Sequence, residues 1–385
     1  MKLNNNSILA VIGSGTMGSG IAQVAATHGH KTYLFDQSSD ALEKAKKNLL
    51  SIHDRLVEKG KIDESRKVEI LNNIIYTNNI SDLKDSNFVI EAIIEDLEIK
   101  KDLFKRLQEV IKGDVIYSTN TSSLSIAALS SSIAKPENFL GVHFFNPAPL
   151  LPLVEIVPSF ITDNSITSQV KHLIDSWAKI TVLAKDTPGF IVNRVARPFY
   201  SESLRILDEG IADIATIDWA MKTFGGFRMG PFELMDFIGH DVNYIVTESV
   251  FKEFYYDPRF KPSITQKRLV EAGMNGRKSG RGFYNYAEGA LNPIPLEDKL
   301  LGEYIYKRVI VMLINEAFDA LFMNIASKED IELAMTKGVN YPKGLFEWGD
   351  ELGLEYVLKR IQDLNNEYQE DRYRPNPLLK RMANK

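Results

Sequence analysis

The stretch ILAVIGSGTMGSG, at residues 8–20, carries a short apolar run straight into a glycine-rich turn. The run predicts a buried strand, and the pattern of residues 19–27 predicts a helix directly after the turn. A tight turn and the close approach of a pyrophosphate both favour glycine, and the N-terminus of a helix presents N–H groups to phosphates. A GxGxxG pattern also occurs in turns that serve packing alone, so its meaning depends on the residues that follow.

The next predicted strand, residues 32–35, ends in a carboxylate, Asp36. A carboxylate about 20 residues beyond such a turn binds both hydroxyls of an adenosine ribose and repels a 2′-phosphate. The sequence therefore predicts a dinucleotide site that favours NAD over NADP. Its predicted cofactor-binding residues are Gly13, Gly15, Thr16, Met17, Gly18 and Asp36.

Residues 1–186 alternate strand-like and helix-like runs, which is typical of βαβ units and predicts an α/β Rossmann-type domain. A charged stretch at 41–73, broken at Gly60, predicts an inserted helical hairpin. The expected strands are 8–12, 32–35, 88–92, 115–118, 139–144, 153–157 and 181–183.

Beyond the Pro188–Gly189 pair the strand-like runs stop, and we expect an all-helical domain at 187–286. Residues 300–385 form an internal repeat of it. A shift of 114 positions aligns 201–239 with 315–353 without a gap, and 12 of the 39 positions are identical. This predicts a second, shorter all-helical copy with a structural role, in a homo-oligomer or in an intrachain pseudo-dimer of helical domains.

The composition excludes several classes of protein. A formal charge of −5 argues against nucleic-acid binding, and the absence of cysteine excludes disulfides, thiolate zinc sites and cysteine nucleophiles. We expect no metal site. No apolar run reaches about 18 residues, and the N-terminal residues lack a secretory pattern, so we expect a cytoplasmic protein with no membrane partner.

His143 is the histidine that lies inside a predicted buried strand, and Glu155 lies within the apolar run of the next strand. A buried carboxylate is costly without a partner, and pairing with an imidazole would meet that need and raise the base strength of His143. Such an imidazole accepts the proton when an alcohol is oxidised. From spacing alone, structural roles for both residues stay open.

Two further polar residues lie where a ligand could reach them. Ser122 follows the strand at 115–118, and Asn193 falls in the first helical turn after Gly189. Polar groups at strand ends hydrogen-bond nicotinamide ribose or substrate oxygens, but both residues also suit helix capping.

Seven stretches, in order, resemble the 3-hydroxyacyl-CoA dehydrogenase family over residues 7–286. They are GSGTMGSGIAQVAA, EAIIEDLEIK, STNTSSLSI, GVHFFNPAPLLPLVEIV, DTPGFIVNR, MGPFELMDFIG and GRKSGRGFYNY. The region after residue 300 resembles a second copy of the family's C-terminal helical domain. The resemblance implies NAD-dependent oxidation of a short-chain (S)-3-hydroxyacyl-CoA, such as 3-hydroxybutyryl-CoA, to the 3-oxoacyl-CoA, as in fatty-acid β-oxidation.

The resemblance also implies roles for single residues. His143 corresponds to the general base and Glu155 to its orienting partner, while Ser122 and Asn193 correspond to residues that touch the reacting oxygens. Lys59 matches a coenzyme A contact, although Ile52 stands where relatives often carry Ser. The implied cofactor-site residues are Glu95, Lys100, Asn120 and Asn146.

Two other functions stay open. A dehydrogenase of a free 3-hydroxy acid or sugar acid would keep the histidine–glutamate pair but not the coenzyme A contacts. A nonenzymatic NAD-binding scaffold would need neither.

Overall fold

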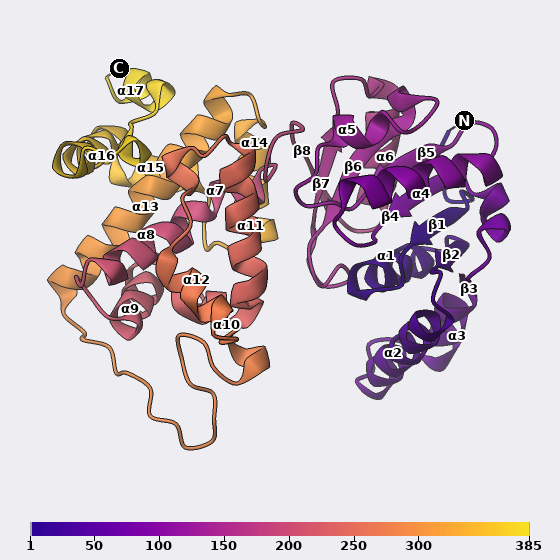
Figure 1. Cartoon of the computed structure of the whole chain (residues 1–385), viewed down its shortest axis with the longest axis horizontal. Coiled ribbons are helices and arrows are strands. Elements are labelled where there is room, and N and C mark those ends of the chain that lie inside the picture. The colour runs from indigo at the N-terminus through magenta and orange to yellow at the C-terminus, as the bar shows by residue number, and fades with distance from the viewer. Residues whose placement is uncertain (1, 385) are drawn as a thin grey trace. The chain divides into compact units, whose positions relative to one another are not determined.

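The computed structural model describes residues 2–384 and divides the chain into two compact units (Figure 1). The first unit ends at Thr187 and the second begins at Pro188. Gly189 has a φ of +73°, in the left-handed region that favours glycine. The sequence pattern places the start of the helical domain at residue 187, one residue before the start of the second unit.

One sheet forms the centre of the first unit, and the described residues supply it with eight strands. Their order is β3-β2-β1-β4-β5-β6-β7-β8, and only β6 and β7 pair antiparallel. This arrangement, with helices on the sheet and a helical second unit, confirms the predicted fold class. The strands are β1 Leu9–Ile12, β2 Thr32–Phe35, β3 Ile74–Thr77, β4 Phe88–Glu91, β5 Ile116–Thr119, β6 Phe139–Phe144, β7 Leu153–Pro158 and β8 Ile180–Leu183.

The edge strand β3, Ile74–Thr77, is the described strand that the sequence pattern missed. It has four residues and begins directly after a helix, so its short apolar run is hard to separate from the helical pattern before it. Pairing with β2 on one side is what makes it a strand.

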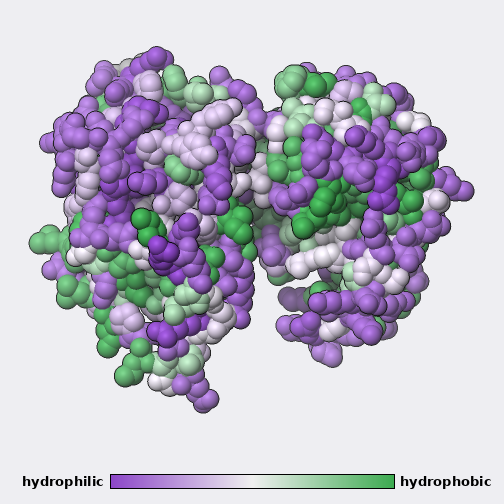
Figure 2. Space-filling model, in the orientation of Figure 1, coloured by the Kyte–Doolittle hydropathy of each residue, from purple (hydrophilic) through white to green (hydrophobic). Residues whose placement is uncertain are grey.

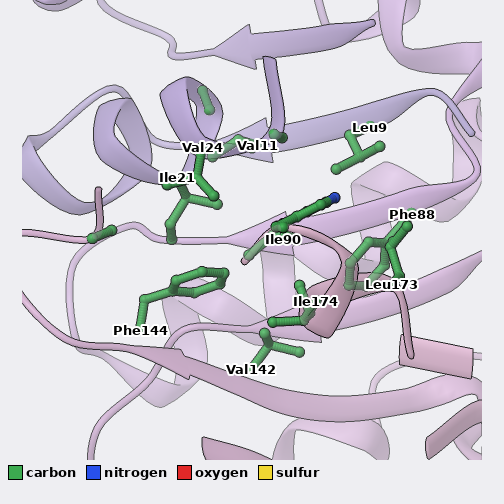
Figure 3. Close-up of a cluster of buried hydrophobic side chains, with 14 of the residues drawn as sticks. Leu9, Val11, Ile21, Val24, Phe88, Ile90, Val142, Phe144, Leu173 and Ile174 are labelled. Carbon is green, nitrogen blue, oxygen red and sulfur yellow. The ribbon is translucent and has the colours of Figure 1, made fainter. Parts of the chain in front are cut away.

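A hydrophobic core lies between the sheet and its helices (Figure 3). Val11, Ile90 and Val142, on β1, β4 and β6, are fully buried, as are Ile21 from α1 and Ile174 from α6. Burying such side chains is the main favourable term in folding. The core therefore fixes the positions of β1, β4 and β6, the strands that carry or precede predicted site residues. The helices of this unit outside the hairpin are α1 Thr16–Thr27, α4 Leu97–Val110, α5 Ile126–Ser130 and α6 Asn164–Ser176, with 3-10 turns at η1 Ile80–Asp85 and η2 Pro136–Asn138.

Two helices, α2 Ser39–Glu58 and α3 Glu64–Asn72, form the hairpin expected at 41–73. Ser38 caps α2 by accepting the N–H of Ala41 at 3.2 Å, and Asp63 caps α3 in the same way. Gly60, with a φ of +62°, lies in the connection between them.

Helices alone form the regular structure of the second unit within the described residues. Nowhere in residues 2–384 is there a helix with the length and apolar character needed to cross a membrane. The first copy contains α7 Val192–Val195, α8 Arg197–Asp208, α9 Ile214–Gly225, α10 Pro231–Ile238, α11 His240–Glu253 and α12 Ile264–Glu271, with 3-10 turns at η3 Pro258–Phe260 and η4 Arg277–Ser279. The second contains α13 Lys299–Phe322, α14 Lys328–Leu333, the π-turn η5 Ala334–Gly338, α15 Leu345–Leu352, α16 Leu354–Tyr368, the 3-10 turn η6 Asp371–Tyr373 and α17 Pro377–Ala383.

The internal repeat is a structural repeat. With the same shift of 114, the start and end of α10 coincide with those of α15, and the start of α11 coincides with that of α16. Gly239 and Gly353 share an unusual backbone conformation, with φ of +99° and +81°. The correspondence therefore extends to single backbone positions.

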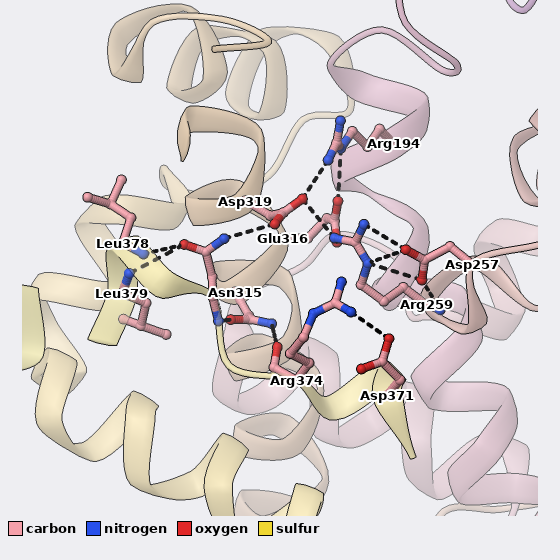
Figure 4. Close-up of polar contacts among 11 residues, drawn as sticks. Arg194, Asp257, Arg259, Asn315, Glu316, Asp319, Asp371, Arg374, Leu378 and Leu379 are labelled. Carbon is pink, nitrogen blue, oxygen red and sulfur yellow. Dashed lines mark hydrogen bonds and ion pairs between the residues drawn. The ribbon is translucent and has the colours of Figure 1, made fainter. Parts of the chain in front are cut away.

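The two copies pack on each other through reciprocal buried ion pairs. Arg194 Nε lies 2.9 Å from Glu316 Oε1, and Arg308 Nε lies 2.6 Å from Glu202 Oε1. The shift of 114 converts the first pair into the second. Figure 4 shows the first pair, in which Asp319 also contacts Arg194. Such exchange of equivalent contacts is the property of an isologous interface between two like subunits.

The connection between the copies, residues 287–298, carries exposed apolar side chains. Leu291 and Ile294 are almost fully exposed, and Figure 2 shows hydrophobic side chains gathered at the lower end of this unit, where that loop runs in Figure 1. The connection therefore adds little to the core of either copy.

Candidate active site

Two positions of the glycine turn between β1 and α1 leave no space for a side chain. A side chain at Gly13 would meet the carbonyl oxygen of Ala92 at 2.6 Å, and one at Gly18 would meet the carbonyl oxygen of Gly13 at 1.8 Å. At Gly15 the space is open, with no atom within 4 Å. Gly15 is also the N-cap of α1 and offers no side-chain cap to the first N–H groups. The turn therefore presents backbone donors on an open side, which fits a pyrophosphate.

Asp36, at the end of β2, connects to the turn through Ser14. Its Oδ2 accepts both the backbone N–H and the hydroxyl of Ser14, each at 2.9 Å, and its Oδ1 accepts the N–H of Ser38. The carboxylate is thus held beside the glycine turn, as a ribose-binding role would require.

A cavity of about 380 Å³ lies beside the turn and is lined by Gly13, Asp36, Ile94 and Arg106, among others. Gly13 and Gly15 are the predicted turn residues that line it, and the apolar wall formed by Ile94 and by Ile99 and Leu103 of α4 was not predicted. Ile94 is 67% exposed, and the exposure of a single side chain cannot be predicted from the sequence pattern. The glycines, the carboxylate and the apolar wall together fit the adenosine end of a dinucleotide.

Two carboxylates surround a buried lysine near the start of α4. Lys100, on α4, is 1% exposed, and its Nζ lies 2.6 Å from Glu91 and 3.2 Å from Glu95. Sequence reasoning identified Lys100 and Glu95 but missed Glu91, the fully buried last residue of β4. A carboxylate inside an apolar run, FVIEAII at residues 88–94, was the signal, and the same kind of signal identified Glu155. Lys100 therefore pairs with protein carboxylates rather than facing an open site.

Glu95 organises the polar loop after β5. Its Oε1 accepts the hydroxyl of Ser123 at 3.0 Å, the backbone N–H of Ser122 at 3.1 Å and the hydroxyl of Thr121. Burial opposes ionisation of Glu95, but Lys100 and the Thr121 hydroxyl outweigh it and lower the pKa of this carboxyl. The carboxylate therefore stays charged and fixes the backbone that carries Ser122.

Asn120 joins the ends of two neighbouring strands. Its side-chain oxygen accepts the N–H of Phe144, the last residue of β6, at 2.8 Å. Asn146, two residues further along, is exposed in the loop after β6. The structure thus brings Asn120 next to the strand of His143, while Asn146 faces outward.

His143 and Glu155 lie opposite each other on the antiparallel pair β6 and β7. The imidazole Nδ1 is 2.7 Å from Glu155 Oε2, and both side chains are buried. The ring of Phe145 packs against the imidazole, with centroids 4.6 Å apart. Strand register thus brings the two predicted residues into direct contact.

The remaining predicted residues lie elsewhere. Lys59 is exposed at the C-cap of α2. Asn193 is the second residue of α7, in the helical unit, and is half-buried. Within residues 2–384 no group of three or more acidic or histidine side chains is arranged to hold a metal ion.

A larger cavity, about 960 Å³, lies between α1 and the hairpin and was not predicted. Leu49, Ile52 and Leu56 line it from α2, and it reaches Ser14 and Gly15 of the turn. The helical spacing of those three apolar residues was the signal in the sequence. The wall of this cavity is mostly apolar, so a ligand there would contact apolar side chains more than charged ones.

Comparison with known proteins places these features in one family. Residues 8–187 match the family model for the 3-hydroxyacyl-CoA dehydrogenase NAD-binding domain, and residues 189–286 and 304–385 match the model for its C-terminal domain. The chain is 38% identical to 3-hydroxyadipyl-CoA dehydrogenase of Escherichia coli, over 98% of both proteins. It is 42% identical to 3-hydroxybutyryl-CoA dehydrogenase of Clostridioides difficile, over 72% of this chain and 99% of that one. A solved structure of 3-hydroxybutyryl-CoA dehydrogenase from Escherichia coli superposes with a TM-score of 0.92 at 37% identity, over 99% of this chain and 98% of that one.

Proposed function

Because this chain belongs to the 3-hydroxyacyl-CoA dehydrogenase family and is an NAD-dependent oxidoreductase, we propose that it oxidises short-chain (S)-3-hydroxyacyl-CoA to the 3-oxoacyl-CoA. In this proposal His143 is the general base and Glu155 orients it. The observation that carries the proposal is the buried contact of 2.7 Å between the two side chains.

The carboxylate gives the imidazole a defined proton arrangement. With Glu155 at Nδ1, that nitrogen carries the proton, so Nε2 is the atom that accepts a proton from a substrate hydroxyl. The carboxylate also stabilises the imidazolium once the proton has arrived. NAD, when bound, supplies the hydride acceptor. Burial of the pair keeps water from competing for this proton.

We assign the cofactor to the glycine turn and the carboxylate beside it. The backbone of the turn would hold the pyrophosphate and Asp36 the adenosine ribose, supported by the open space at Gly15 and the hydrogen bonds from Ser14. The residues proposed to hold NAD are Gly13, Gly15, Thr16, Met17, Gly18, Asp36, Glu95, Asn120 and Asn146. Lys100 supports this site indirectly, because its ion pair with Glu95 helps to fix that carboxylate.

We assign substrate contacts to Ser122 and Asn193, as hydrogen-bond partners of the reacting oxygens, and to Lys59, as a coenzyme A contact. The fixed backbone at Ser122 supports the first assignment, and the other two rest on family resemblance. A second proposed substrate is 3-hydroxyadipyl-CoA, because the Escherichia coli enzyme of that name matches 98% of this chain.

Loss of NADH absorbance with acetoacetyl-CoA, against free acetoacetate, tests the reaction. Turnover of the thioester alone supports the proposal, and equal turnover of the free acid favours a hydroxy-acid dehydrogenase. Initial rates with 3-hydroxybutyryl-CoA and 3-hydroxyadipyl-CoA then rank the two acyl groups.

Replacing His143 tests the mechanism. His143→Gln removes the proton acceptor and is expected to lower kcat about 100- to 10,000-fold, while NADH binding by fluorescence is retained. His172→Gln is the matched control, because His172 is exposed on α6 of the same unit. Glu155→Gln is expected to lower kcat by about 10- to 100-fold or more, since it removes the charge that orients the base and stabilises the imidazolium. Full activity of His143→Gln would show that His143 is not the general base.

A further inference from the structure

The helical unit contains a polar cavity of about 300 Å³, and none of the proposed site residues lines it. It lies between α8, α11, the start of α12 and the segment that precedes α17. Four basic side chains line it: Arg197, Arg205, Lys261 and Arg372. Four positive charges around a small cavity repel one another unless carboxylates or a bound anion compensate them.

Arg197 is the most unusual of these residues, because its charge is buried without a carboxylate. The side chain is only 4% exposed. Its Nη1 donates to the hydroxyl of Thr247 at 3.0 Å, and its Nε has no hydrogen-bond partner. The Tyr200 ring, 4.9 Å from the guanidinium carbon, gives partial compensation. Among residues 2–384, no aspartate or glutamate forms an ion pair with it, and burial lowers the pKa of this arginine.

Arg372 repeats the pattern in weaker form. It is 7% exposed, and its Nε makes no hydrogen bond. Its nearest carboxylate oxygen is that of Glu370, at 3.4 Å. Glu370 is shared, because it also accepts from Arg205 at 3.0 Å. One carboxylate thus serves two guanidinium groups.

The other carboxylates at the cavity already have partners, among them Arg205, whose Nε donates to Glu209 Oε1 at 3.0 Å. Asp208 accepts the hydroxyl of Thr265 at 2.6 Å, and Glu209 accepts from Arg308 at 2.8 Å and from the hydroxyl of Tyr368 at 2.7 Å. The first turn of α12, capped by Ser263, also borders the cavity and adds the positive end of a helix dipole. The acidic residues therefore leave Arg197 uncompensated.

The second helical copy acts as an internal comparison. With the shift of 114, Arg197 corresponds to Val311, and Thr247 corresponds to Ile361. Both of these residues are apolar and fully buried. Packing at this position therefore needs no charge, and the arginine in the first copy answers another requirement.

We propose that this cavity binds a small oxyanion, a phosphate or a carboxylate, that pairs with the guanidinium groups of Arg197 and Arg372. A planar guanidinium matches either group in a bidentate pair, and an anion there would compensate the buried charge. The volume lies at the lower end of the range for ligand pockets, about 300–1,000 Å³, which suits a small ion or metabolite.

Calorimetric titration of the full-length protein tests this site. Inorganic phosphate and malonate are titrated separately at constant ionic strength, with NADH at saturation so that the glycine turn is occupied. Saturable binding of either ion is expected, and phosphate alone or malonate alone identifies the preferred oxyanion. Arg197→Met should weaken the binding about tenfold or more, since it removes charged hydrogen-bond donors.

Two further variants keep the result decisive. Arg228→Met is the matched control, because Arg228 is exposed in the same unit and does not line the cavity, and it should bind as wild type does. Arg372→Met tests the other guanidinium if Arg197→Met does not fold by circular dichroism. The proposal is overturned if neither ion binds, or if the folded Arg197 and Arg372 variants bind as tightly as wild type.

Discussion

The two helical copies share their contacts with each other but differ at the position proposed to touch substrate. Arg194 and Arg308 occupy equivalent positions and bind equivalent glutamates across the interface. The residue before each arginine is Asn193 in the first copy and Lys307 in the second. In the second copy this segment is part of the continuous helix α13, whereas the first copy breaks it into α7 and α8. The second copy therefore retains the arginine that packs the copies together but not the asparagine proposed to contact substrate.

The copies also share a device that caps a helix. Asp218 accepts the N–H groups of Phe232 and Glu233 at the start of α10. Glu332, at the equivalent position, accepts three N–H groups at the start of α15. A side chain at Gly230 would meet Asp218 Oδ1 at 2.3 Å, and one at Gly344 would meet Glu332 at 2.2 Å. The matching glycines therefore make room for matching carboxylates.

The largest expected effect comes from breaking the interface. Arg308 is fully buried and contacts Glu202 and Glu209, so Arg308→Met leaves Glu202 charged and buried. We expect the unfolding free energy to fall by about 3–5 kcal/mol. Arg194→Met should act in the same direction. Urea unfolding followed by tryptophan fluorescence measures this, because Trp219 and Trp348 lie in this unit.

The double variant Arg308→Met with Glu202→Met should recover most of that loss, since two apolar side chains replace two buried charges. A loss below about 1 kcal/mol for Arg308→Met would place this pair among ion pairs of negligible effect. The reciprocal contacts would then describe the interface without stabilising it.

A second expected difference concerns pH. Burial raises the pKa of Asp218 to about 7, with the charge of Glu233 in the same direction, against hydrogen bonds from Tyr284 and the backbone. Unfolded aspartate has a pKa of about 3.9, so the folded protein holds the extra proton between these values. Stability from this group is full below pH of about 4 and is lost as the pH rises to about 7.

Asp218→Asn does not titrate, so its unfolding free energy should decline less than that of wild type over this range, by roughly 3 kcal/mol. Glu332→Gln should give a smaller change of the same sign, because burial also raises the pKa of Glu332 but that side chain is only half-buried. Parallel pH profiles for wild type and Asp218→Asn would contradict the protonated state.

The sequence predicted features that depend on local pattern and strand pairing. The glycine turn and the contact of His143 with Glu155 follow from runs whose period or register is visible in the residues. The reciprocal pairs needed one more step, since extending the same shift of 114 beyond the aligned region brings Arg194 onto Arg308. The uncompensated charge of Arg197 could not be predicted, because burial and the absence of a partner depend on how four segments pack.

The smallest expected effect is also the one that separates the copies by function. If Asn193 holds a reacting oxygen, Asn193→Ala should lower kcat/KM about tenfold to a hundredfold, since one hydrogen bond is lost. Lys307→Ala removes only a surface ion pair with Glu303, at 3.1 Å, and should leave kcat/KM unchanged. Both variants keep the neighbouring arginine, so the interface is preserved and steady-state kinetics reports the side chain itself. Equal kinetics for the two variants would contradict the substrate contact proposed for Asn193.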